Sequence, residues 1–254
     1  MRRCLACLPS LRPAWPAVLA AALLAAGCSS TPAPRGKLPE RDMEGKEWGQ
    51  SDVNRVATLG MQANLQSLYR LMDKLYRRNP QEWKKGGYAS RDEAMKAVRG
   101  AIETSQPWPE LLDQRDIQGM SMSLSPQFAG DRVAAFIYST ADMLITAHGG
   151  RTTFYLIHGQ DAQALYNAAR NLEIANWMLT HRTQANGQPL LLTNEITAQD
   201  RNLSFEREFG KMIARVDLLA EVTSEKYRRA VIGYVQGLAG GSLFQFLPVQ
   251  AVAN

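Results

Sequence analysis

Cys28 is the residue with the clearest chemical role in this sequence. It directly follows the small residues 25–27, and an apolar run over 17–26 precedes it. The chain starts with a basic stretch that contains Arg2, Arg3 and Arg12. A basic start, an apolar stretch and a small-residue cleavage site together form an export signal. Because the cysteine comes directly after that site, its thiol can be acylated before cleavage exposes its amino group.

Residues 1–30 resemble the signal of bacterial lipoprotein precursors, in which a short lipobox ends at the acylated cysteine. Ala25 stands where that family usually has a large aliphatic residue, and Leu24 lies one place earlier. The resemblance implies a signal peptide over 1–27 and lipid, with palmitate among the acyl chains, on Cys28. Ser29 follows the cysteine instead of Asp, which in this family implies sorting to the periplasmic side of the outer membrane rather than to the inner membrane.

An uncleaved anchor and ordinary secretion are the alternatives for this leader. Its apolar run is shorter than the ~20 residues that a membrane-spanning helix needs, and Pro13 and Pro16 lie at its front. Residues 28–50 then combine several prolines with alternating charges and almost no large apolar residue. That composition predicts a flexible tether between the lipid and the folded part.

Cysteine usage and charge exclude several classes of function. Of the three cysteines in the sequence, Cys4 and Cys7 would leave with the leader and Cys28 would carry lipid. The mature chain would then have no free thiol for catalysis, redox chemistry or zinc binding. Loss of three leader arginines leaves 26 basic and 24 acidic residues from the original 29 and 24. Such a balanced chain gives no support for nucleic-acid binding.

Three histidines could bind a metal with the carboxylates of Asp142, Asp161 or Glu173. However, His148, His158 and His181 include no pair at i, i+4, and no HExxH frame occurs. His148 and His181 instead fall in the last turns of predicted helices, where an imidazole interacts favourably with the helix dipole. We therefore expect no metal and no cofactor.

Carboxylates could also form the acid/base pair of an enzyme that acts on peptidoglycan. Glu173 is the most suggestive, because Leu172 and Ala175 flank it and Trp177 lies one turn on. A buried Glu173 paired with Arg170 at i, i+3 is the simpler interpretation. No GxSxG, Walker A or GxGxxG motif is present. We assign no catalytic residue, and the envelope enzyme stays an alternative.

Gly233, Gly237 and Gly241 are spaced by four, so a helix would place them on one face where another backbone can approach closely. Residues 230–254 contain no charged side chain. We expect a buried last helix followed by an apolar tail across the bundle. Packing between copies through these glycines, and insertion into a membrane, are the alternatives.

An aromatic group and a basic group occur close together in the sequence. The aromatic residues could form a ligand platform, but core or rim packing explains them equally; they are Tyr69, Tyr76, Trp83 and Tyr88. The basic residues could meet anionic phospholipid, but a solvated helix end is the simpler interpretation; they are Lys74, Arg77, Arg78, Lys84 and Lys85.

Helical periodicity dominates the chain after the tether. Four helices are predicted to begin at the N-caps Ser51, Ser90, Asp131 and Asp161. A last apolar stripe follows Ser204 with spacings of three and four, and Thr223-Ser224 is expected to divide it into two helices. No repeat of fixed period is evident, although a degenerate helical repeat stays open.

Extended segments are few. Thr152 to Ile157 is predicted to be a short strand that pairs with Pro189 to Ile196, and 120–124 to be a strand or an irregular connection. The prediction is a single mainly α domain over 51–254, a bundle of about six helices with a small two-stranded β element.

These observations favour a lipid-anchored envelope protein with a structural or interaction role and no chemistry of its own. Its expected partners are the membrane, through the N-terminal lipid, and another envelope protein, with homo-oligomer contact possible through the three glycines. The alternatives are the peptidoglycan enzyme and a module that binds a small ligand or lipid in a pocket of Met and aromatic side chains.

Overall fold

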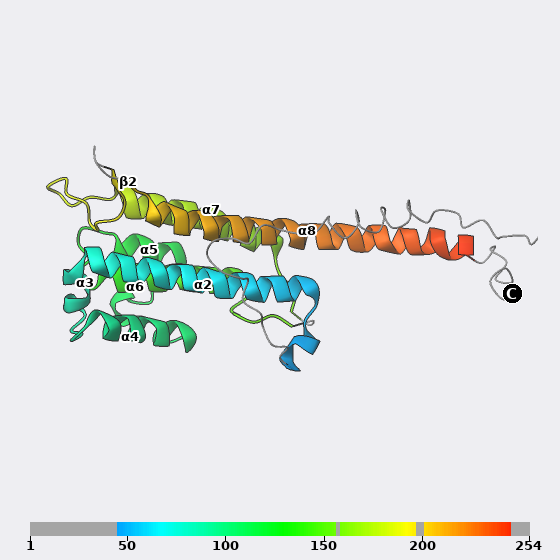
Figure 1. Ribbon diagram of the computed structural model, residues 1–254, viewed down its shortest axis with the longest axis horizontal. Coiled ribbons are helices and arrows are strands. Elements are labelled where there is room, and N and C mark those ends of the chain that lie inside the picture. Colours follow the sequence, from blue (N-terminus) through cyan, green and yellow to red (C-terminus); the bar gives the residue numbers. More distant parts are fainter. Residues whose placement is uncertain (1–44, 156–157, 197–200, 245–254) are drawn as a thin grey trace, which may run out of the picture. The chain divides into compact units, whose positions relative to one another are not determined.

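The computed structural model describes residues 45–155, 158–196 and 201–244, and these form a mainly α-helical bundle, as predicted (Figure 1). The described residues lie in one compact unit that begins at Gly45. The α-helices of these ranges are α2 (Asp52–Arg78), α3 (Pro80–Lys85), α4 (Arg91–Glu103), α5 (Asp116–Ser123), α6 (Arg132–Ala147), α7 (Ala162–His181) and α8 (Ser204–Phe244). Two 3-10 helices, η2 (Gly45–Gly49) and η3 (Pro109–Leu111), accompany them.

The four predicted helix starts are confirmed by their capping bonds. Ser51 accepts from the backbone N–H of Asn54, and Asp161 accepts from those of Gln163 and Ala164. Ser90 accepts from Glu93 N–H, while the Glu93 carboxylate accepts from Ala89 N–H, one residue before the cap. Such bonds satisfy backbone donors that have no partner inside the helix.

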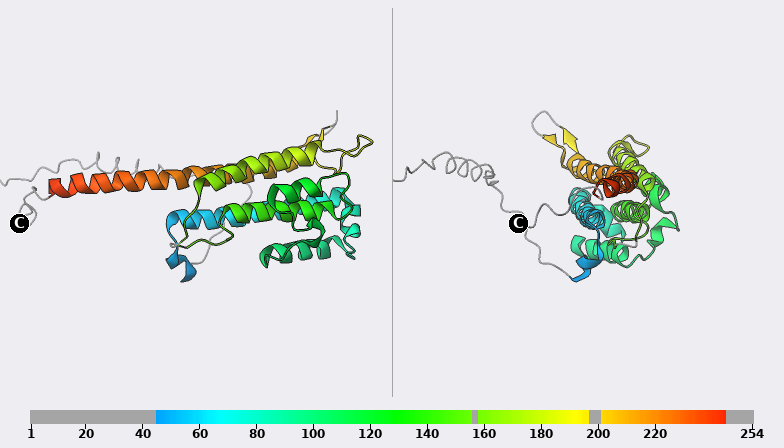
Figure 2. Two further views of the ribbon diagram at one scale, coloured as in Figure 1. Left: turned by 180° about the vertical axis from the view of Figure 1, so that it is seen from behind. Right: turned by 90° about the vertical axis from the view of Figure 1, so that its right-hand side faces the viewer.

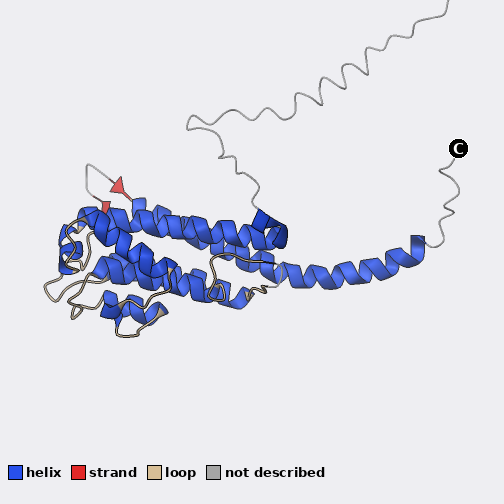
Figure 3. Ribbon diagram, turned by 90° about the horizontal axis from the view of Figure 1, so that it is seen from below, coloured by secondary structure: helices blue, strands red, loops and turns tan. Residues whose placement is uncertain are grey.

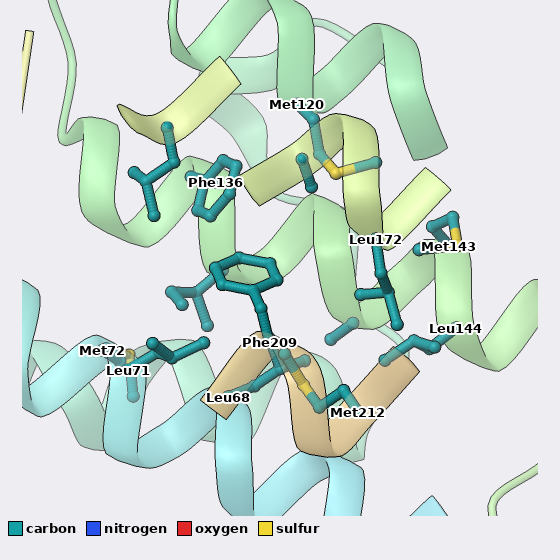
Figure 4. Close-up of a cluster of buried hydrophobic side chains, with 14 of the residues drawn as sticks. Leu68, Leu71, Met72, Met120, Phe136, Met143, Leu144, Leu172, Phe209 and Met212 are labelled. Carbon is teal, nitrogen blue, oxygen red and sulfur yellow. The ribbon is translucent and has the colours of Figure 1, made fainter. Parts of the chain in front are cut away.

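Helix α6 lies at the centre of the bundle and packs against α2, α4, α5 and α7. Its N-cap Asp131 is fully buried and accepts from Ala134 N–H. Eleven of its 16 residues are buried, as expected for a helix with apolar residues around most of its circumference. Phe136 of α6, Phe209 of α8 and Leu172 of α7 belong to one large core cluster (Figure 4).

The prediction of a strand or an irregular connection at 120–124 is wrong, because residues 120–123 belong to helix α5. Met120 and Ser123 are buried in the bundle, and α5 packs closely on α6. A Cβ at Gly119 would lie 2.5 Å from Ser139 Oγ of α6, so only glycine allows this approach. Residues 120–123 are helical because they pack against α6. The alternating pattern of residues 120–124 gives no information about that contact.

The predicted strand at 152–157 is wrong over its described residues 152–155, and 156–157 lie outside the described part. Helix α2 supplies the hydrogen bonds that a neighbouring strand would have made. Thr58 Oγ1 accepts from Phe154 N–H at 3.1 Å, and Asn54 Nδ2 donates to Tyr155 O. The small β element that exists pairs β1 (Glu195–Ile196) with β2 (Arg201–Asn202) in antiparallel fashion.

The end of the predicted tether is part of the fold. Residues up to 44 lie outside the described part, but Gly45–Gly49 forms η2, and Gln50 Nε2 donates to Phe154 O at 2.7 Å. Glu47 forms an ion pair with Arg55 of α2. The folded part thus begins about six residues earlier than Ser51.

Helix α8 is one continuous helix of 41 residues, so the predicted division at Thr223-Ser224 is wrong. Neither residue breaks a helix as Pro would, and Thr223 is buried on the stripe that continues through it. The first half of α8 packs along α7 and α2, and the second half continues past both (Figures 1 and 3). The two ends of the helix therefore have very different surroundings.

Candidate functional site

Cys28, the lipid-attachment residue inferred from the sequence, lies outside the described residues, as does the signal over 1–27. No helix in the described part of the chain combines the length and the apolar character required to span a membrane. The candidate sites that the structure describes lie within residues 45–155, 158–196 and 201–244.

The three histidines have separate local roles. His148 is the C-cap of α6, is buried, and donates from Nδ1 to Leu144 O at 2.7 Å. Burial lowers the pKa of His148, and the hydrogen bond to Leu144 opposes this only in part. His158 Nδ1 accepts from Tyr155 N–H, and His181 stacks on Trp177 at 5.2 Å between centroids. Among the described residues, no three His, Cys, Asp or Glu side chains group to hold a metal ion.

Glu173 is paired with Arg170 as expected, at 2.9 Å, but it is not buried. Its side chain is 47% exposed, and Arg170 also bonds Asp217 of α8 at 2.6 Å. The nearby Trp177 is exposed as well. The expectation of a buried Glu173 is wrong because the flanking Leu172 and Ala175 point to the core while Glu173 lies on the outer face of α7. This geometry is an ordinary surface ion-pair network.

The aromatic residues of the N-terminal half belong to the core and its rim rather than to a shared platform. Tyr76 is fully buried and donates to Asp131 Oδ2 at 2.7 Å, while Trp83 and Tyr88 pack at the core margin. Tyr69 lies under the guanidinium of Arg99 at 4.3 Å. Arg77 and Arg78 of the adjacent basic group pair with Asp73 and Glu195, and Lys85 pairs with Glu82.

A cavity of about 350 Å³ lies between α6 and the segment that connects α4 to α5. Trp108 and Tyr138 form an aromatic wall with centroids 6.0 Å apart. Arg115 donates from Nε to Asp142 Oδ2 at 3.0 Å and from Nη2 to Asp142 Oδ1. Their pairing leaves the two charges directed at each other rather than at the cavity. The sequence interpretation named Asp142 only as a possible metal ligand and did not find Arg115, which lies 27 residues away.

Backbone strain gathers in this connecting segment. Ser105, Leu112, Asp113 and Asp116 are the non-glycine residues with positive φ in the described ranges, at 54°, 47°, 64° and 52°. Left-handed φ costs most for a residue such as Leu, with no side-chain hydrogen bond to compensate. The Arg115–Asp142 pair ties this strained segment to α6, which gives it a structural role.

The most unusual surface is the distal segment of α8, defined as residues 224–244. Every residue whose exposure is described between 224 and 237 is exposed. These include Val231 at 66%, Tyr234 at 70% and Val235 at 57%. The expected buried last helix is therefore wrong for residues 231–237, and the predicted tail beyond 244 lies outside the described residues. Gly233 and Gly237 have open space where a Cβ would be.

The distal segment continues the stripe that is buried in the proximal half. Phe209, Met212, Val216 and Leu219 are buried against the bundle, and Thr223 follows four residues on. The same spacing of three and four then continues through Tyr227, Val231, Tyr234 and Leu238. An unbroken stripe of this spacing marks one helix face. Val231 and Tyr234 on this face are exposed, whereas Phe209, Met212, Val216 and Leu219 are buried.

No protein-family model matches this sequence, and no curated protein and no solved structure matches it.

Proposed function

We propose that this chain is a lipid-anchored protein of the bacterial outer membrane that faces the periplasm and acts through protein contacts. The distal segment of α8 carries the interaction part of the proposal: it is a helix with exposed large apolar residues, and its last 15 residues include no charge. Exposed apolar surface of this kind marks an interaction site. The lipid anchor rests on Cys28 and the leader that precedes it.

A helical segment without a packed face is only marginally stable in water. The proximal half of α8 packs against the bundle, whereas Val231, Tyr234 and Val235 of the distal segment are exposed. A protein partner would remove this surface from water, at about 25 cal/mol per Å² of apolar area. In this proposal the distal segment of α8, which continues past α2 and α7, is the docking helix.

Replacement of Cys28 by Ser tests the anchor in cells. We expect Cys28→Ser protein to move from the membrane fraction to the soluble fraction, because lipid chains supply the attachment. The matched control replaces Cys4 and Cys7 by Ser, which should leave the protein membrane-bound. Membrane-bound and normally processed Cys28→Ser protein would contradict the proposed anchor.

Photo-crosslinking in intact cells tests the docking helix. A benzophenone amino acid in place of Tyr234 should give specific adducts with protein, whereas the same probe in place of the exposed Lys96 on α4 should give none above background. Equal, diffuse labelling from both positions would show that the distal segment has no specific partner.

A further inference from the structure

We propose that the partner of the distal segment is a second copy of this chain, bound in antiparallel orientation through the continued stripe of α8. This inference rests on the proposed function, because it names the partner of the same surface. It assigns to Val231, Tyr234 and Val235 the contact that Val216 and Leu219 make inside the bundle.

The distal segment continues a helix face that is already packed inside the bundle. Along the proximal half, α2 and α7 pack against the stripe and bury Phe209, Met212 and Val216. Beyond them α8 continues as a helix with no further element of the described chain beside it (Figure 2), and the three- and four-residue spacing of its apolar residues continues in the sequence. A partner helix that lies along the line of α2 and α7 would extend the same packing. The α8 helix of a second copy could be this partner, because its own apolar residues follow the same spacing of three and four.

The two halves of α8 differ in charge. The proximal half of α8 meets α2 through ion pairs and polar bonds, with Glu208 bonded to Arg70 at 3.0 Å and Arg215 bonded to Ser67 at 3.2 Å. The distal segment has no charge after Arg229. A surface without charge offers no complementarity to a charged partner, but two such surfaces meet without repulsion or buried unpaired charge. Self-pairing therefore suits residues 230–244 better than docking to a polar surface.

The position of the bundle relative to the stripe selects the antiparallel orientation. The stripe faces the side on which α2 and α7 lie. Two copies that met stripe to stripe in parallel would place both bundles in the same space. An antiparallel pair moves the bundles to opposite ends and overlaps only the distal segments, over about 30 Å at 1.5 Å per residue. The uncharged residues 230–238 of the two copies then face each other at the centre, and the charged residues 225–229 lie at the ends of the overlap. A two-fold axis then passes near residue 234, the middle of the distal segment, as in an isologous dimer.

Gly233 and Gly237 are compatible with this arrangement, although the proposal does not depend on them. Gly233 and Gly237 flank the stripe, and their Cβ positions are open. Small residues beside a contact line let two helix backbones approach closely. The sequence predicts a homo-oligomer contact through Gly233, Gly237 and Gly241. In the arrangement proposed, Gly233 and Gly237 lie beside the apolar seam, and Val231, Tyr234 and Val235 make the bulky contacts.

Cysteine crosslinking of the full-length, membrane-anchored chain tests the proposal. If Cys28 is acylated, Tyr234→Cys introduces the one free thiol of the mature protein. Under mild oxidation in cells we expect a disulfide-linked species with twice the mass of the chain. Gln236→Cys is the matched control, because it lies on the opposite face of the same turn and should give several-fold less.

The outcomes separate this inference from the proposed function. A Tyr234→Cys adduct with a protein of another mass would overturn self-pairing and leave the docking helix in place. Equal, weak products from Tyr234→Cys and Gln236→Cys, together with absent photo-adducts at 234, would overturn both.

A mixed experiment tests the orientation. Antiparallel pairing about residue 234 brings Val231 of one copy opposite Gly237 of the other. Co-expressed Val231→Cys and Gly237→Cys chains, distinguished by an epitope tag, should therefore give more crosslinked heterodimer than either chain gives alone. Strong self-crosslinking of Val231→Cys expressed alone, with no gain on mixing, would show parallel pairing and overturn the antiparallel arrangement.

Discussion

The buried carboxylate of Asp131 has two roles. It caps the N-terminus of α6, and it accepts a hydrogen bond from the hydroxyl of Tyr76. Two further carboxylates bind the backbone there: Glu110 accepts from Asp131 N–H and Glu82 from Arg132 N–H. A Cβ on Gly130 would lie 2.7 Å from the Glu110 carboxylate, so a larger residue here would displace the carboxylate that accepts from Asp131 N–H. The pKa of Asp131 is raised to about 6, mainly by burial and to a lesser degree by the neighbouring Glu82 and Glu110, while the bonds from Ala134 and Tyr76 oppose the rise.

The raised pKa of Asp131 predicts how stability depends on pH. The folded protein holds this proton more tightly than the unfolded chain, whose Asp has a pKa near 3.9. The contribution of this group is therefore greatest below pH 4 and is lost as pH rises through 6. Asp131→Asn keeps an N-cap and an acceptor but removes the titration. Between pH 4 and 7, wild type should lose on the order of 2–3 kcal/mol relative to this variant in urea unfolding.

An unchanged pH dependence in Asp131→Asn would contradict this account. Urea midpoints at several pH values, compared between the two proteins, isolate the contribution of Asp131 because the other titrating groups are common to both.

The Arg115–Asp142 pair makes a second prediction at the residue scale. The Asp142 side chain is 10% exposed, whereas that of Arg115 is 67% exposed. Arg115→Ala would leave a nearly buried carboxylate without its cation, at a cost of about 1–2 kcal/mol of unfolding free energy. The double variant Arg115→Ala/Asp142→Asn should recover part of that loss. A simple sum of the two single effects would mean that the pair contributes no coupling.

At the scale of elements, sequence reasoning succeeded where the signal is local. Ser51, Ser90, Asp131 and Asp161 identify helix starts because a cap needs only residues a few positions away. Helix α5 was missed because Met120 and Ser123 are held by α6, which comes later in the chain. The exposure of Val231 was missed for a similar reason. A stripe shows which face of α8 is apolar, but only the lengths of α2 and α7 determine where that face loses its cover.

The strained connection between α4 and α5 gives a prediction for an element. Leu112 is 72% exposed, so its side chain contributes little packing energy. Its backbone has φ 47°, and this left-handed conformation costs conformational free energy. Leu112→Gly should stabilise the protein by about 0.5–1 kcal/mol, the strain of ~1–2 kcal/mol being offset in part by the entropy of glycine in the unfolded chain. This change should raise the melting temperature by about 1–4 °C.

The same substitution elsewhere should have the opposite sign. Leu218 is also exposed, at 58%, but lies inside α8. Leu218→Gly should therefore destabilise by about 1 kcal/mol, the cost of glycine in a helix interior. Destabilisation by both variants would show that the backbone at Leu112 is not strained. Differential scanning calorimetry of the two variants and wild type makes the comparison.

In the molecule as a whole, the proposed attachment and the proposed contact surface lie in different segments. Cys28 would fix one segment to lipid, residues 45–223 fold into a bundle, and the distal segment of α8 presents apolar side chains without charge. The candidate site could be predicted only in part from sequence: the missing charges after Arg229 and the three glycines were visible, but their exposure was not. The position of a surface depends on the packing of the entire bundle.

A double substitution on the distal segment distinguishes the stability of the bundle from the self-association of the chain. Val231→Glu combined with Val235→Lys places a favourable i, i+4 pair on the distal segment, so the helix persists while its apolar seam is lost. Because association stabilises the folded state by mass action, the melting temperature of wild type should rise with protein concentration. That of the double variant should be independent of concentration and equal to the wild-type value at high dilution.

A control on the same stripe tests the physical reason. Val216 is 1% exposed, so Val216→Glu places an unpaired charge in the core and should lower the melting temperature at every concentration. If the Val231→Glu/Val235→Lys variant behaved like Val216→Glu, the distal segment would be part of the folded core of a single chain. If it melts as wild type does at high dilution, residues 224–244 contribute nothing to that core, and their apolar side chains serve association alone.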